Sequence, residues 1–273
     1  SIPDFTALLS LTQLYLRGNQ LNGTLPDFTA LTSLTRLYLS GNELSGSVPD
    51  FSSLHTLTHL FLSDNQLSGS IPDFSALPSL AHLQISSNEL TGSIPDFSAL
   101  PSFTILDLQS NQLSGIIPDF SSVPDLKTVS LSRNLLNGSI PDFSALHNLT
   151  HLYLTTNQLS GSIPDFTALS ALTSLQLDRN QLSGSIPEFS ALPFLEFLRA
   201  DNNQLRGTIP DYANLPNGTF NTLNLRNNDL CGTLPTDNPV PSDAPDIDEN
   251  TFLNPSPAWC GACATFDDVA GLC

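Results

Sequence analysis

The sequence predicts a solenoid of about ten coils, an α/β array in which every coil adds a strand to one parallel sheet. The segment LYLSGNELSGSVPDF at 37–51 returns at 60–74 as LFLSDNQLSGSIPDF, 23 residues later. Fixed self-similarity of this length is typical of solenoids, whose coils contact only their neighbours and share one core. An asparagine marks each coil, at Asn19, Asn42, Asn65, Asn88, Asn111, Asn134, Asn157, Asn180, Asn203 and, 25 residues further on, Asn228.

The stretch before each asparagine predicts the strand. In the pattern Leu-x-x-Leu-x-Leu, Leu14 and Leu16 alternate with Tyr15, so the leucines face inward and the tyrosine outward. Strands of adjacent coils then pair in a parallel sheet about 4.8 Å apart. The asparagine amide is expected to bond backbone groups of neighbouring turns that would otherwise be buried without partners.

An acidic residue followed by an aromatic one occurs after each Gly-x-Ile-Pro segment, as in Asp96-Phe97. We expect the phenylalanines to stack as a spine on the convex side of the core. The aspartate is interpreted as the N-cap of a short helical or irregular convex turn. A row of cation-binding carboxylates is the alternative, but calcium needs six to eight oxygens that converge on one point.

The chain divides into a solenoid at 1–235, an extended Pro- and Asp-rich segment at 236–257, and a cysteine-containing tail or cap at 258–273. The first five residues repeat the middle of a later coil, so the array is expected to start in mid-repeat without an N-terminal cap. We expect the tail to fold back through a disulfide from Cys231. A zinc site is the alternative, because two of the cysteines form Cys-x-x-Cys. The four cysteines are Cys231, Cys260, Cys263 and Cys273.

Charge and composition exclude several classes of function. A net charge of −18 opposes binding to nucleic acid and to anionic membranes. The chain has no apolar run of about 18 residues, so membrane insertion is not expected. Clustered cysteines together with glycosylation sequons favour a secreted or cell-surface glycoprotein. The sequons begin at Asn22, Asn137, Asn148 and Asn217.

The repeat Leu-x-x-Leu-x-Leu-x-x-Asn-x-Leu-x-Gly-x-Ile-Pro resembles the leucine-rich repeat family, and within it the plant-type extracellular subclass. The resemblance covers 1–235. It implies a curved, extracellular, non-catalytic scaffold that binds a protein, peptide or glycan on its concave face.

The outward strand residues of the first coils are the candidate binding site. Exposed aromatic residues beside arginine are typical of interaction hot spots and can also stack on sugar rings. The alternative is that these rings only pack against their cross-strand neighbours. The candidate residues are Tyr15, Arg36, Tyr38, His59, Phe61 and His82.

No enzyme is expected, because the sequence has no nucleophile motif and no metal-ligand spacing, and it predicts no cofactor. His59 and His82 lie on adjacent strands, but no third metal ligand accompanies them. Two functions remain open. One is a recognition scaffold. The other is a structural subunit that self-assembles through its uncapped repeat end into a filament, sheath or surface layer.

Overall fold

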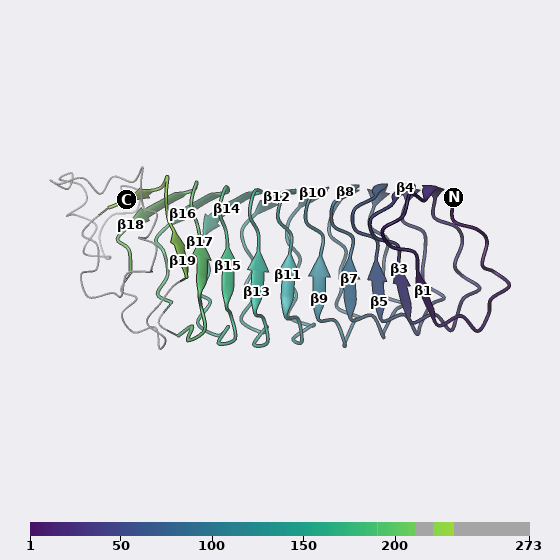
Figure 1. The fold of residues 1–273 in the computed structure, drawn as a ribbon. Helices are drawn as coiled ribbons and strands as arrows, with labels where there is room; N and C mark the ends of the chain where they lie inside the picture. Colours follow the sequence, from purple (N-terminus) through teal and green to yellow (C-terminus); the bar gives the residue numbers. More distant parts are fainter. Residues whose placement is uncertain (190, 211–220, 232–273) are drawn as a thin grey trace.

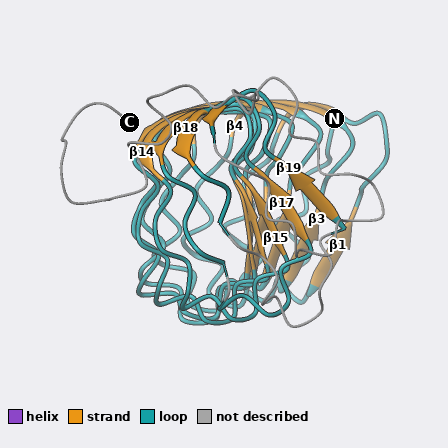
Figure 2. Cartoon of the chain, turned by 90° about the vertical axis from the view of Figure 1, so that its left-hand side faces the viewer, coloured by secondary structure: helices purple, strands orange, loops and turns teal. Residues whose placement is uncertain are grey.

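The chain forms an elongated array of stacked coils (Figure 1). A computed structural model describes residues 1–189, 191–210 and 221–231. Within these residues the secondary structure consists of strands and turns, arranged as two parallel sheets of ten strands each. Viewed along the array, the two sheets form two sides of each coil and loops complete it (Figure 2).

The odd-numbered strands form the first sheet, which is the predicted parallel sheet. Each strand pairs with the one 23 residues later, as Tyr15 does with Tyr38 and Tyr38 with Phe61. Every central leucine faces the core while the two flanking residues face outward. The strands are β1 (Gln13–Tyr15), β3 (Arg36–Tyr38), β5 (His59–Phe61), β7 (His82–Gln84), β9 (Ile105–Asp107), β11 (Thr128–Ser130), β13 (His151–Tyr153), β15 (Ser174–Gln176), β17 (Phe197–Arg199) and β19 (Thr222–Asn224).

The even-numbered strands form a second sheet that the sequence interpretation missed. Its neighbours are staggered, so that Ser47 pairs with Ser68 rather than with the residue 23 positions later. The strands are β2 (Asn22–Thr24), β4 (Glu43–Ser47), β6 (Gln66–Ser70), β8 (Glu89–Gly92), β10 (Gln112–Gly115), β12 (Leu135–Gly138), β14 (Gln158–Ser162), β16 (Gln181–Gly184), β18 (Gln204–Gly207) and β20 (Asp229–Leu230).

The core is one continuous stack of leucine, isoleucine and phenylalanine. The predicted phenylalanine spine is confirmed: Phe97, Phe120 and Phe143 are each at most 2% exposed, and their ring centroids are 6.2–6.4 Å apart along the array. Phe103 packs against Phe97 at 5.1 Å and thickens the spine in the middle coil. Burial of this kind is the main stabilising term, since each coil covers the apolar face of the next.

The asparagine ladder is also confirmed. The Asn111 amide nitrogen donates to the carbonyl oxygens of Ile85, Leu108 and Gln109 at 3.1–3.3 Å, and its oxygen accepts the Leu90 N–H at 3.0 Å. One side chain therefore joins its own turn to the preceding coil. The same pattern recurs from Asn42 onward.

The aspartates on the loop side do not cap helices, so the predicted helical turns are wrong for the described residues. The Asp96 carboxylate accepts the backbone N–H of Ser98 at 2.8 Å and its hydroxyl at 2.8 Å. Bonding two residues ahead closes a local turn instead of a helix. In Asp4, Asp27 and Asp73 this backbone bond, with the side-chain bond to the same residue, lowers the carboxyl pKa.

The residue before most of the asparagines adopts a left-handed conformation. The first two coils use Gly18 and Gly41 there, whereas later coils hold non-glycine residues such as Thr156, at φ 57°. A β-branched side chain is strained in this region. The asparagine bonds that follow hold the turn in place.

Some expectations lie outside the described residues. Cys231 is fully buried at the end of β20. Cys260, Cys263, Cys273, Asn217 and the segments 236–257 and 258–273 are not described, so the cysteine pairing and the domain boundaries stay predictions. Across the described part of the chain, no helix is long and apolar enough to span a membrane.

Candidate functional site

Three aromatic side chains stand in a row on β1, β3 and β5. The Tyr38 and Phe61 rings stack with centroids 4.5 Å apart and planes 8° from parallel. Tyr15 meets Tyr38 edge-on at 4.7 Å. Because the strands pair in register, identical positions in successive coils bring the rings together.

The row packs internally and also stays open to solvent. Tyr15 is 48% exposed, and Tyr38 and Phe61 are half-buried. Cross-strand packing therefore orders the rings without covering them. The two interpretations of these residues describe the same arrangement, since an ordered aromatic surface loses little entropy when it binds.

Two histidines extend the row. The His82 ring is parallel to Phe61 within 1° at 6.4 Å, and the His59 and His82 centroids are 4.3 Å apart. The Thr58 hydroxyl lies 2.8 Å from both the Thr35 carbonyl oxygen and His59 Nδ1. Since its single proton goes to the carbonyl, neutral His59 carries its proton on Nδ1 and leaves Nε2 as an acceptor.

The field around these groups is set by cations. Burial, then His82 and Arg36, lowers the pKa of His59, and burial, then Arg36 and Lys127, lowers the pKa of His82. Interaction with the Tyr15 hydroxyl raises the pKa of Arg36. The six predicted site residues thus form one surface, which we call the aromatic–basic patch.

A column of residues just beyond the strands also borders this face, and the sequence interpretation overlooked it. Ser86 Oγ lies 2.9 Å from both Ser63 Oγ and Asp107 Oδ2. Burial raises the pKa of Asp107, although these hydroxyl bonds and the Gln109 N–H oppose the shift. Counting outward every second residue past the strand end would have found this column.

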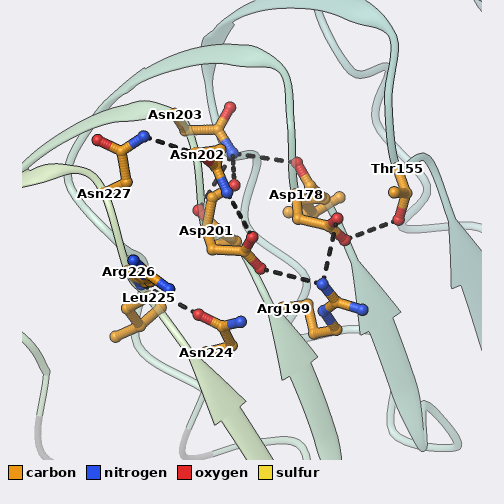
Figure 3. A network of polar contacts seen from close by, with 12 residues as sticks. Thr155, Asp178, Arg199, Asp201, Asn202, Asn203, Asn224, Leu225, Arg226 and Asn227 are labelled. Carbon is orange, nitrogen blue, oxygen red and sulfur yellow. Dashed lines mark hydrogen bonds and ion pairs between the residues drawn. The ribbon is translucent and has the colours of Figure 1, made fainter. Parts of the chain in front are cut away.

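The far end of the same column is a tied-down ionic network (Figure 3). Arg199 Nη2 lies 3.5 Å from both Asp178 Oδ2 and Asp201 Oδ1. Thr155 donates to Asp178 at 2.7 Å, and Asn202 donates to Asp201 at 2.7 Å. Burial raises the pKa of Asp178 despite Thr155 and Arg199. The carboxylates are 1% and 5% exposed, so this network joins coils and leaves little for a ligand to contact.

The described residues contain no cluster of three or more His, Cys, Asp or Glu side chains suited to a metal ion. The sequon residues Asn22, Asn137 and Asn148 are exposed. Asn137 lies on β12 in the second sheet, and the Asn148 amide donates to Asp125 at 3.2 Å.

The comparisons with known proteins agree with this geometry. Models described as "Leucine rich repeat" match residues 101–159, "Leucine Rich repeats (2 copies)" 55–98, and "Leucine Rich Repeat" 10–30, 33–54 and 171–191. Together these matches cover more than half of the chain. The chain belongs to the leucine-rich repeat family. A search of curated protein sequences gave no significant match.

Solved leucine-rich repeat structures resemble the array over most of its length. The Arabidopsis receptor kinase HAESA, in complex with the peptide hormone IDA and the co-receptor SERK1, is 34% identical, with a TM-score of 0.81 over 92% of this chain and 44% of that one. The plant peptide hormone receptor RGFR1, in complex with RGF2, is 31% identical, with a TM-score of 0.71 over 90% and 49%. The chain therefore spans about half the length of these receptor ectodomains.

A third similar structure has a different described role. A plant ice-binding protein is 35% identical, with a TM-score of 0.69, and the match covers 89% of this chain and 77% of that one. The same fold therefore serves peptide recognition in some relatives and ice binding in another.

Proposed function

We propose that the chain is an extracellular, non-catalytic scaffold that recognises a protein or peptide through the aromatic–basic patch. The observation that carries the proposal is the ordered yet exposed row of Tyr15, Tyr38 and Phe61 on the first sheet. Aromatic anchors of this kind dominate binding energy at interfaces. The peptide-bound receptor kinases with the same fold support this role.

The rest of the first sheet offers a matched comparison. Tyr153 occupies the same column as Tyr38 and is also half-buried, but of the aromatic side chains only His151 contacts it, at 5.7 Å. If a pre-ordered row is what binds, loss of Tyr153 should leave binding intact.

The test is selection from a displayed library of random peptides on the full chain. Peptides enriched on the wild type should lose at least tenfold in affinity on Tyr38→Ala, an interface hot-spot loss of more than about 1.4 kcal/mol. Tyr153→Ala should bind them normally. Failure to enrich any peptide, or equal loss in both variants, would count against the proposal.

Ice binding is a second candidate, favoured by the outer face of the second sheet. Over strands β10 to β16 its outward residues carry no charge, in a chain with 26 acidic residues. They repeat from coil to coil at the strand spacing of about 4.8 Å, with hydroxyl and amide groups that hydrogen-bond water. These residues are Gln112, Ser114, Leu135, Asn137, Gln158, Ser160, Ser162, Gln181 and Ser183.

Thermal hysteresis and inhibition of ice recrystallisation test this candidate directly. Ser160→Lys places a long charged side chain in the middle of the uncharged face and should abolish the activity, while Tyr38→Ala should retain it. A wild-type chain without either activity would remove ice binding from consideration. The alternative of self-assembly through the first coil stays a prediction that light scattering addresses.

A further inference from the structure

The first four strands of the first sheet separate charge sharply from the rest of the molecule. The chain holds 26 acidic and eight basic residues, yet the outward positions of β1, β3, β5 and β7 contain no carboxylate. They contain Arg36, His59 and His82, and Arg17 stands at the next outward position after β1. The next outward carboxylate along the sheet is Asp107 on β9.

The electrostatics of the histidines reflect this separation. The charged groups that shift the pKa values of His59 and His82 are all cations, namely Arg36, Lys127 and the neighbouring histidine. A positive island of this kind, surrounded by a strongly negative molecule, attracts anionic groups and repels cationic ones.

The ring geometry restricts the kind of anion. Tyr38, Phe61 and His82 stand nearly parallel along the array, with centroids 4.5 and 6.4 Å apart. Their faces are turned toward one another, and a planar group needs about twice the 3.5 Å carbon contact distance to enter between two rings. A sugar would have to stack on a ring face, and these faces are already used.

The ring edges and the polar tips stay available. The Tyr15 hydroxyl already donates to Gln13 at 2.7 Å, which fixes its position beside Arg36. The Arg36 guanidinium is half-buried and can accept a bidentate carboxylate. Apolar side chains can pack on the ring edges while carboxylates meet Arg36 and the histidines.

We propose that the aromatic–basic patch binds an acidic peptide segment, in which Asp or Glu side chains alternate with apolar ones. This rests on the proposed function and specifies its ligand class. Carboxylates bind Arg36 and the histidines, and the apolar residues cover Tyr38 and Phe61. The negative remainder of the chain discriminates against basic peptides.

The experiment sequences the peptides that the full chain enriches from a random library. The expected result is enrichment of Asp and Glu next to Phe, Tyr or Leu, with binding that weakens as salt rises. Arg36→Gln should weaken the enriched peptides about tenfold, as for loss of a charge-assisted hydrogen bond. Arg206→Gln, which removes an arginine paired with Asp229 at 3.4 Å on the second sheet, is the matched control and should have no effect.

The two proposals fail in different ways. Neutral or basic peptides that still depend on Tyr38 would overturn the acidic specificity and leave the recognition function standing. No enriched peptide at all would overturn both. Tighter binding of dextran sulfate than of the acidic peptides would also overturn the peptide assignment. Circular dichroism on each variant confirms that the array remains folded.

Discussion

The asparagine ladder gives the sharpest prediction of stability. Asn111→Ala removes three bonds donated by the amide and one accepted from Leu90, all at 3.0–3.3 Å around a side chain that is 8% exposed. At about 1 kcal/mol for each net hydrogen bond, the free energy of unfolding should fall by about 4 kcal/mol.

The first coil provides the control. Asn19 occupies the same position but is exposed, and its amide donates only to the Leu16 and Arg17 carbonyl oxygens. Asn19→Ala should therefore cost about 1 kcal/mol or less, because water can replace the lost donor. Asn111→Asp should be worse than Asn111→Ala, since it places a carboxylate oxygen against three carbonyl oxygens.

Urea unfolding followed by circular dichroism and by tyrosine fluorescence measures the loss, and coincident transitions establish two-state behaviour. The reasoning is refuted if Asn111→Ala costs no more than Asn19→Ala. It is equally refuted if Asn111→Asp is as stable as the wild type, because the amide donors would then be dispensable.

Four further changes test other parts of the argument. Phe97→Ala should cost about 3–5 kcal/mol in urea unfolding through a cavity in the spine, and a cost below 1 kcal/mol would contradict its core position. Asp96→Ala should cost about 1 kcal/mol as a lost turn bond, and calcium should not alter the melting temperature of the wild type. Thr156→Gly should raise stability by about 1 kcal/mol, because glycine relieves the left-handed backbone; a loss would show that the threonine side chain contributes more than the strain. Since the pKa values of His59 and His82 lie below the ordinary 6.5, the unfolded chain binds more protons, and stability should fall as pH drops below about 6.5. Replacing both with glutamine should flatten unfolding free energy between about pH 7 and 5, and an unchanged slope would exclude these histidines as its source.

The sequence by itself determined the coil count, the first sheet, the phenylalanine spine and the asparagine ladder. Each of these follows from a period of 23 residues, because a repeat that stacks on itself must place equivalent side chains side by side. The same logic located Tyr15, Tyr38 and Phe61 on one face. Their contact needed no more than the register of adjacent strands.

Tertiary structure decided the features that depend on how coils are offset. The second sheet pairs residues 21 positions apart, as Ser47 and Ser68 do, which a 23-residue alignment hides. Its strands also carry Gly and Ser, which have little intrinsic preference for strands. Asp96 bonds two residues ahead and closes a turn, because the coil turns too tightly there for a helix. Asp178, Asp201 and Arg199 form their network only because neighbouring coils bury the two carboxylates within reach of one guanidinium.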